Sequence, residues 1–405
     1  MKSVVNVLLA IGALHLWAVP VRAQSSEPDL SRVRLRFGPL LVNPTIALTN
    51  AGVDTNVFNQ AESDRPKSDF TMTVTPQADV WLRLGRTWLA ANVREDVVWY
   101  KTYSSERSVN NNYTVGWLVP LTRFTFTANG NWINARERPG YEIDARSDRS
   151  ERGVNATADA RVLSKTFFGV RGDIRKVEFD RDAVFLGTNL HDELTRTQTS
   201  AAVTVRHELT PLTSLTVDVG RQQDRFDFSP LRDSDSTYVT LGVRFDSRAL
   251  ISGSAKVGLR DFQLRSLGVE DYRGSTAAVD LSYVALGSTR LGLNMARDVQ
   301  YSFNADQPYY LQTGFTGSLS QHIYGPLDVE ARAGIQRLAY RSREGVIVAR
   351  SNRVDRVHTY GGGVGYRVGR DLRVGFSVDR QQRQSGLDLR NYAGLRFGMA
   401  MTYAR

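Results

Sequence analysis

The last twelve residues, GLRFGMAMTYAR (394–405), decide the fold class. Apolar side chains occupy every second position of this stretch, and the positions between them are small or polar. The apolar set is Leu395, Phe397, Met399, Met401 and Tyr403. Alternation with a period of two predicts a β-strand with one apolar face. The rest of the chain must show whether that face packs against a protein core or against lipid.

The same alternation runs through the chain after residue 24, and no long stretch has the period of a helix. Tight connections such as LGRT (84–87) and YGPL (324–327) alternate with longer polar loops such as 137–148 and 181–194. The tight connections are typical of hairpin turns. A unit of strand, tight turn, strand and long loop recurs roughly every 40 residues. This organisation predicts about 18 antiparallel strands.

Three features favour a membrane barrel over a soluble β-sandwich or a propeller. The apolar stripes rarely carry a charge at the centre of a strand. A sheet of about 18 strands must curl or close. Aromatic residues lie near both ends of the apolar stripes, where two aromatic girdles are expected in a barrel wall. These girdle residues are Trp99, Trp117, Trp132, Phe168, Tyr366 and Tyr403. We therefore expect an all-β protein that forms a closed antiparallel transmembrane β-barrel of about 18 strands (16–18). Its turns should be short on the periplasmic side and its loops longer on the extracellular side.

The N-terminus has the pattern of a secretory signal peptide over residues 1–23. It has a positive Lys2, an apolar segment over 4–19 and a small-residue cleavage site at 21–23. The apolar segment is short for a transmembrane anchor. Residues 24–43 are expected to form a periplasmic tail, and residues 44–405 the barrel. The RVRLRF run (32–37) of the tail could add a short strand or fold into the mouth of the barrel. The predicted location is the outer membrane of a Gram-negative bacterium.

If apolar residues face lipid, the alternate residues line a polar lumen. At 16–18 strands such a lumen is wide enough for an aqueous channel. The charged candidates are Arg94, Asp159, Arg161, Arg171, Asp173, Arg175, Asp218, Arg244, Asp280, Glu330, Arg332, Arg367, Arg373, Asp379 and Arg396. One interpretation is a selectivity lining that favours anionic solutes. The other is a lattice of arginines and carboxylates that pair with one another and brace the wall. The sequence leaves both open.

Composition and motifs limit the function classes. The chain has 52 Lys+Arg against 42 Asp+Glu and no cysteine. The basic excess consists mostly of arginine, which suits planar anions, although genomic base composition is the favoured explanation. Nucleic acid is not expected as a partner of an exported chain without an aromatic and basic motif. No zinc-protease, nucleophile-elbow or phosphate-loop motif is present. The sequence predicts no enzyme, no cofactor and no metal.

The first hairpin carries a more specific pattern. GVDTNVF (52–58) is followed by SDF (68–70) and by Pro76. Together they resemble the putative β-barrel porin 2 family of bacterial outer-membrane proteins. The resemblance implies an outer-membrane conduit or accessory for exopolysaccharide secretion, and it supplies no catalytic residue. Asp54 and Asn56 lie within the pattern, and we expect them to have a structural hydrogen-bonding role near the start of the first loop.

Two functions therefore stand beside each other. The first is a polar conduit or accessory for exopolysaccharide secretion; the alternative is a general or anion-preferring solute porin. A third and weaker one is a structural or adhesive barrel acting through loops such as 181–194. Porins usually have a long constriction loop that folds inward. The longest loops here have about 12–14 residues, so we expect no such loop, which favours a wide conduit. The expected partners are outer-membrane lipid and lipopolysaccharide, the barrel-assembly machinery, and polysaccharide with periplasmic export proteins.

Overall fold

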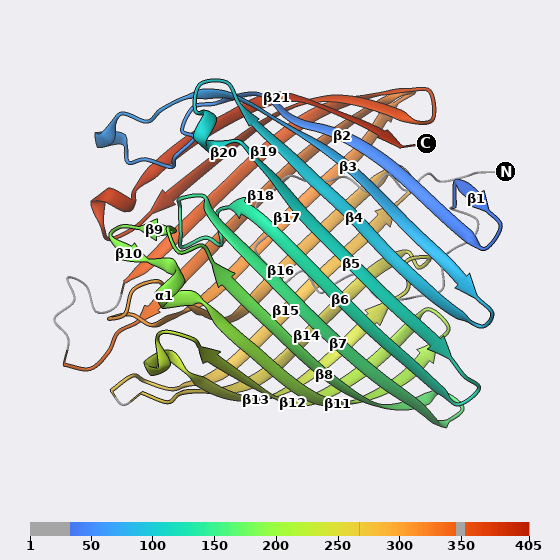
Figure 1. The fold of residues 1–405 in the computed structure, drawn as a ribbon. Coiled ribbons are helices and arrows are strands. Elements are labelled where there is room, and N and C mark those ends of the chain that lie inside the picture. Colours follow the sequence, from blue (N-terminus) through green and yellow to red (C-terminus); the bar gives the residue numbers. More distant parts are fainter. Residues whose placement is uncertain (1–32, 267, 346–352, 405) are drawn as a thin grey trace.

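The computed structural model describes residues 33–266, 268–345 and 353–404, and the fold is shown in Figure 1. Within these residues, eighteen antiparallel strands form a closed barrel, which confirms the predicted fold class. The predicted signal peptide (1–23) and the first part of the predicted tail lie outside the described residues. No helix in the described ranges is long and apolar enough to cross a membrane.

The strands of the wall follow one another around the barrel in sequence order. They are β2 (Leu40–Asp54), β3 (Asp69–Leu84), β4 (Thr87–Tyr100), β5 (Ser108–Pro120), β6 (Phe124–Glu137), β7 (Ser147–Leu163), β8 (Thr166–Phe179), β11 (Arg196–Thr210), β12 (Thr213–Phe226), β13 (Ser234–Phe245), β14 (Ile251–Leu264), β15 (Tyr272–Ala285), β16 (Thr289–Tyr301), β17 (Tyr309–Tyr324), β18 (Leu327–Arg341), β19 (Val354–Val368), β20 (Leu372–Gln384) and β21 (Tyr392–Ala404). The last strand pairs with the first, β21 with β2, so the sheet has no open edge.

The remaining short elements are not strands of the closed wall. They are β1 (Leu35–Phe37), β9 (Val184–Phe185), β10 (Thr188–Asn189), helix α1 (Leu190–Leu194) and the 3-10 helices η1 (Glu62–Asp64), η2 (Ser104–Glu106), η3 (Pro230–Arg232) and η4 (Asp388–Arg390). The RVRLRF run does add a short strand, because β1 pairs with the start of β2. The elements α1, β9 and β10 belong to the connection between β8 and β11.

The two ends of the barrel differ in the length of their connections. One end, which we call the turn end, carries tight turns such as the one at Gly85, whose φ of +62° suits glycine. The other end, which we call the loop end, carries α1, β9 and β10 on the left of Figure 1. In outer-membrane barrels the short turns are periplasmic and the long loops extracellular. The loop end is therefore the extracellular end.

The apolar face of each strand is turned outward. Val154, Leu259 and Phe376 keep 63%, 67% and 46% of their surface exposed, whereas a soluble sandwich would bury such side chains. The same holds for Met399 in the last strand, at 54%. An outer surface of this kind is stable only against lipid, and in lipid the sheet must close so that all backbone groups are hydrogen-bonded. The apolar face of the C-terminal strand is thus the lipid face.

The family-like pattern in the first hairpin has a structural cause. The register of β2 shifts between Thr49 and Gly52, where Asn50 has a φ of +53°. A Cβ atom on Gly52 would lie 2.0 Å from the backbone oxygen of Phe397, so only glycine fits there. This bulge occurs where the first and last strands meet, and it lets the barrel close.

Asn56 ties the first loop to the last strand, as the sequence led us to expect. It is buried; its side-chain amide donates to the backbone oxygens of Gln60 (2.8 Å) and Ala393 (3.0 Å), and its backbone N–H donates to Asp54 (2.9 Å). Its Oδ1 accepts from the N–H of Gln60. Asp54 also accepts from Arg396 at 2.6 Å. Both motif residues therefore have structural roles at the seam of the barrel.

Candidate functional site: the lumen and the loop across its mouth

The alternation of each strand places all fifteen predicted lumen residues on the inner face of the wall. Arg94 follows the outward Val93, and Arg396 lies between the outward Leu395 and Phe397. The same alternation holds for the other members of the set. Their contribution to solute passage stays a prediction.

A group of these residues forms ion pairs across β18, β19 and β20. Arg332 pairs with Asp379. Arg373 donates to Asp328 at 2.5 Å and to Glu330 at 2.6 Å. Arg367 lies 3.7 Å from Asp328. The Arg332–Asp379 pair keeps about a quarter of its side-chain surface open, 25% and 31%, so lumen water reaches it. For this part of the wall the paired lattice is the better interpretation.

Further pairs brace other parts of the inner face. Arg94 pairs with Asp96 at 3.1 Å, and Asp218 accepts from Lys256 at 2.8 Å. Arg175 pairs with Glu151 on the neighbouring strand. For Asp280, no ion pair is found among the described residues.

A different arrangement occurs near the turn end of β7 to β13, where Arg161, Arg206 and Arg244 form a group that we call the cationic cluster. The guanidinium groups of Arg161 and Arg206 lie 5.2 Å and 3.9 Å from the centre of the Phe167 ring. Arg206 also pairs with Glu208 at 2.9 Å. Arg244 lies close enough to Arg206 for the two charges to repel each other. Positive charge is therefore only partly compensated here.

The remaining predicted charges lie around this cluster. Asp159 is close enough to attract Arg206, and Arg171 is attracted to Asp173 and Asp218. These are through-space attractions. Arg244 is likewise attracted to Asp246. The inner face thus combines a sector of close ion pairs with a sector in which arginines cluster and most of the attractions to carboxylates act over longer distances.

The six predicted girdle residues lie on the outer face. Trp117, Trp132, Phe168, Tyr366 and Tyr403 are exposed there, from 38% to 54% of their surface. Trp99 is half-buried, because the guanidinium of Arg107 lies 5.1 Å from its ring centre. Their contact with lipid headgroups stays a prediction.

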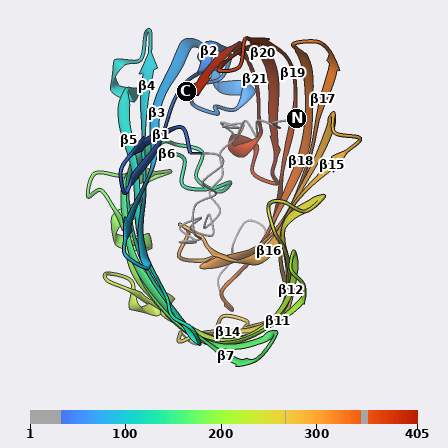
Figure 2. The ribbon, with the colours of Figure 1, turned by 90° about the vertical axis from the view of Figure 1, so that its right-hand side faces the viewer.

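The segment between β6 and β7 folds into the barrel. We name residues 138–146, RPGYEIDAR, the mouth loop. Figure 2, a view along the barrel from the turn end, shows coloured segments of the chain lying inside the ring of strands. At the base of the mouth loop, Arg138 donates to the backbone oxygen of Asp144 at 2.6 Å, which holds the loop in a compact turn. The same side chain reaches the backbone oxygen of Val57, in the connection after β2, at 2.8 Å.

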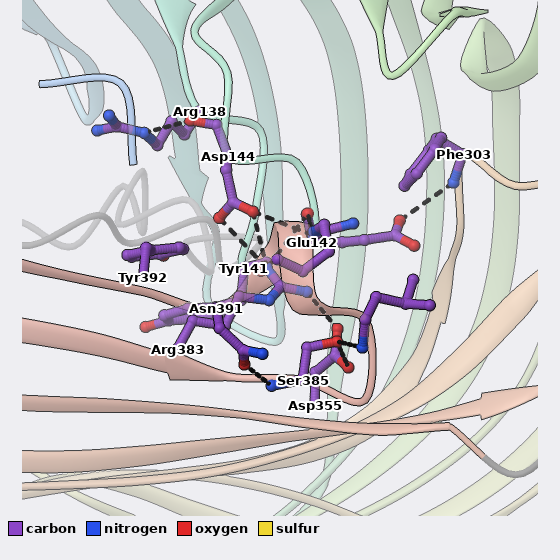
Figure 3. Close-up of polar contacts among 12 residues, drawn as sticks. Arg138, Tyr141, Glu142, Asp144, Phe303, Asp355, Arg383, Ser385, Asn391 and Tyr392 are labelled. Carbon is purple, nitrogen blue, oxygen red and sulfur yellow. Dashed lines mark hydrogen bonds and ion pairs between the residues drawn. The ribbon is translucent and has the colours of Figure 1, made fainter. Parts of the chain in front are cut away.

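Arg383 of β20 attaches the mouth loop to a distant part of the wall (Figure 3). Its side chain is fully buried and donates to Asp355 of β19 at 2.5 Å. It also donates to the backbone oxygen of Tyr141 at 2.6 Å and to the carboxylate of Asp144 at 3.2 Å. Arg390 of η4 adds an ion pair to Asp144 at 3.1 Å. We call Arg383, Arg390, Asp355 and Asp144 the latch.

Glu142 attaches the loop to a third part of the wall, the connection between β16 and β17. Its buried carboxylate accepts from the Ser302 hydroxyl at 2.6 Å and from the backbone N–H of Phe303 at 3.1 Å. Burial raises the pKa of Glu142, and the Ser302 hydrogen bond with the charges of Arg390 and Arg353 offsets part of that rise. The loop therefore holds a carboxyl group that resists ionisation.

Apolar side chains of the mouth loop complete its packing. Ile143 belongs to a buried cluster with Leu190 of α1 and with Phe185 and Phe303, whose rings are 4.9 Å apart. Tyr141 packs against buried residues of β17 and β18, and burial raises its pKa to about 12. The loops at the extracellular end thus share an apolar core with the inward residues of nearby wall strands.

The expectation that no loop folds inward is wrong. The mouth loop is short, but it reaches strands that are not its neighbours, because buried arginines come to meet it from η4 and β20. The sequence contains one signal for the burial of this loop: two apolar or aromatic residues, Tyr141 and Ile143, lie in a connection between strands. Arg383 occupies an inward position near the end of its strand, and nothing in the sequence distinguishes it from the other arginines.

The site holds charged groups suited to binding and steering ions. Among the described residues, no group of three or more His, Cys, Asp or Glu side chains could hold a metal ion.

Residues 28–405 match the model of the family described as Putative beta-barrel porin 2. No curated protein matches this chain in a sequence comparison. Among solved structures, the BenF-like porin from Pseudomonas fluorescens Pf-5 is 8% identical with a TM-score of 0.48, over 91% of this chain and 99% of that one. The outer membrane protein opdK from Pseudomonas aeruginosa is 10% identical with a TM-score of 0.45, over 90% and 98%. The FrpB iron transporter from Neisseria meningitidis is 8% identical with a TM-score of 0.41, over 85% of this chain, which spans only 62% of that structure.

Proposed function

The chain belongs to the putative beta-barrel porin 2 family, and from this premise we propose that it is an outer-membrane channel for small anionic solutes, narrowed at its extracellular mouth. This is the solute-porin alternative of the two functions that the sequence left open. The fold and the family support a transport channel in the outer membrane rather than an enzyme.

The observation that carries the proposal is the attachment of the mouth loop to Arg383. Passage of a polysaccharide chain would require the loop to leave the lumen. That movement would separate Arg383 from Asp144 and would uncover the carboxylate of Glu142. Breaking a buried pair is costly, about 3–5 kcal/mol when one partner is lost. A small solute needs no such movement if it passes beside the loop.

Anion preference is supported by the cationic cluster. Arg161 and Arg206 flank one aromatic ring, and Arg244 lies nearby with a like charge. Partly compensated arginines on one side of a hydrated passage raise the local concentration of anions. The paired sector around Arg332 contributes little net charge, since its carboxylates are matched.

The test is the single-channel conductance and reversal potential of the refolded barrel in a planar bilayer under a salt gradient. The measurement uses a variant whose mouth loop can be locked by a disulfide, Ser302→Cys with Glu142→Cys. The natural side chains at these two positions form a hydrogen bond with each other. The natural chain has no cysteine, so only the introduced pair can form a disulfide. With the loop locked we expect an anion-preferring conductance that reduction changes little. Loss of conductance on locking, restored by reduction, would overturn the proposal.

The family resemblance in residues 52–58 supports a second candidate, a conduit or accessory for exopolysaccharide secretion assisted by periplasmic export proteins. In that case the loop must open. Locking would then abolish polysaccharide release in cells, whereas the reduced or natural protein would sustain it. A solute channel predicts no change in release. The same pair of variants therefore separates the two candidates.

A further inference from the structure

The outer surface of the barrel changes character along the strands. In the middle and toward the turn end it is apolar, as at Val364, Phe376 and Leu319. Near the loop end, outward positions carry charges instead. On β18 the exposed Ile335 is followed two residues later by the exposed Arg337, while Gln336 between them is buried on the inner side. A band of charge therefore borders the lipid face at its extracellular limit.

Along much of this band the outward basic residues have acidic partners. Arg273 pairs with Asp261 at 3.2 Å, and Arg225 with Asp235 at 2.8 Å. These pairs cross between adjacent strands on the same face. They satisfy the charges without any external ligand.

The sector formed by β18, β19 and β20 is different. Arg337, Arg356 and Arg380 are exposed on its outer face, one on each strand. In the part of the chain that the structure describes, none of the three forms an ion pair or a hydrogen bond. The nearby Glu270 faces Arg341 instead, at 3.9 Å. Arg337 and Arg356 lie directly opposite each other, whereas Arg380 lies opposite Tyr360, four residues closer to the turn end.

Arg337 and Arg356 are direct register partners on neighbouring strands. Side chains at directly opposite positions of an antiparallel pair have Cβ atoms about 4.5–5.5 Å apart, and like charges placed there destabilise the sheet. An anion that bridges the two would turn this repulsion into attraction. A phosphate fits best, because two arginine forks can each give it a bidentate pair of hydrogen bonds.

The position of the pair identifies the source of the phosphate. On the turn-end side of Arg337, the next outward residue of the same strand is Ile335. On the turn-end side of Arg356, the next outward residues are His358 and Tyr360, whose ring centres are 6.3 Å apart. A group bound by the arginines would place its hydrocarbon part along this apolar wall. Basic clusters at the edge of a lipid face are suited to anionic lipid headgroups. In the extracellular leaflet of an outer membrane, that lipid is lipopolysaccharide, which carries phosphates on its lipid A.

We propose that Arg337 and Arg356 bind a phosphate of lipid A on the outer wall of β18 and β19. The site lies outside the lumen, so it is independent of what the channel transports. It fixes one lipopolysaccharide molecule beside the strands that carry the latch.

The test measures binding of diphosphoryl lipid A to the purified full-length barrel in detergent by native mass spectrometry. The double variant Arg337→Gln with Arg356→Gln is compared with the natural chain. The matched control is Arg273→Gln, which removes an equally exposed arginine that already has a carboxylate partner. We expect the double variant to bind about 10- to 30-fold more weakly, and the control to bind as the natural chain does. Lipid A without phosphates should bind all three equally weakly.

Two results would overturn the inference. One is equal binding of diphosphoryl lipid A to the natural chain and to the double variant when both migrate as folded barrels on unheated gels. The other is displacement of lipid A by millimolar inorganic phosphate, which would mean that the arginines bind a free anion and not a lipid headgroup.

Discussion

The latch and the paired sector of the wall use the same residue types on the same inner face, but they differ in their access to water. In the latch, Arg383 and Asp355 have no exposed side-chain surface, whereas Arg332 and Asp379 keep 25% and 31% of theirs. Their strands are adjacent, and Asp379 lies only four residues before Arg383 on β20. The difference arises because the mouth loop covers one pair and leaves the other open to the lumen.

This difference determines what each pair can do. A buried charge that loses its partner has no water to replace it, so the loss is costly. A hydrated pair exchanges its partner for water at little cost, about 0–1 kcal/mol. The latch is therefore a structural device that holds the loop, and the wall pairs mainly set the local charge of the passage.

The largest effect is expected from Arg383→Gln. It removes the guanidinium that joins Asp355 to Asp144 and leaves these carboxylates only their second partners, Arg353 and Arg390, at a cost of about 3 kcal/mol to the closed loop. The conductance should rise or become noisy, and trypsin should cleave after Arg146, a site in the loop that is buried in the natural chain. The control is Arg332→Gln. Intact loops and unchanged conductance in the Arg383 variant would show that the latch does not hold the loop.

Glu142 extends the comparison to pH. Burial raises its pKa above the usual 4.5, so the closed loop prefers the protonated carboxyl and the open loop releases the proton more readily. The stability of the closed loop is full below about pH 4.5 and falls as the pH rises toward the raised pKa. Arg353, Arg390 and Arg232 lie near enough to favour the ionised form and reduce the effect.

The measurement is the probability, between pH 4 and pH 8, that a single channel occupies a higher-conductance state in which the mouth loop has opened; we call this the open probability. The loop of the natural chain should open more often as the pH rises. The free energy that favours the closed loop should fall by up to about 1.4 kcal/mol per pH unit within the titrating range. Glu142→Gln keeps an acceptor for Ser302 and cannot ionise, so its open probability should be independent of pH. An identical pH dependence in both proteins would assign the titration to another group.

The two regions also differ in how far the sequence predicted them. The sequence predicted about 18 wall strands, and the described residues form eighteen, because lipid on one side of the wall and water on the other impose strict alternation. Arg332 and Asp379 were placed on the inner face by the same rule. The latch joins Asp144 to Arg383 across 239 residues, and no periodicity relates such positions. Contacts between loops depend on the closed three-dimensional ring, which local patterns do not encode.

A smaller effect on stability is expected at the wall pair. Arg332→Gln should lower the free energy of unfolding by no more than about 1 kcal/mol, because lumen water solvates the remaining Asp379. Urea unfolding of the refolded barrel in detergent measures this change beside that of Arg383→Gln. If the two variants were equally destabilised, the distinction between a buried latch and a hydrated wall pair would fail.

The smallest effect on stability, and the largest on selectivity, is expected in the cationic cluster. Arg206→Gln removes one of two guanidinium groups that flank Phe167 and relieves the repulsion with Arg244, so stability should hardly change. The local positive charge falls by one, and the reversal potential under a salt gradient should shift toward zero. Arg248→Gln is the control, because that arginine is exposed at a turn beside Asp246 and outside the wall. The opposite result, a reversal potential that changes with Arg332→Gln and not with Arg206→Gln, would place the selectivity in the paired sector. Arg332 could attract a passing anion only if its ion pair with Asp379 were broken in solution.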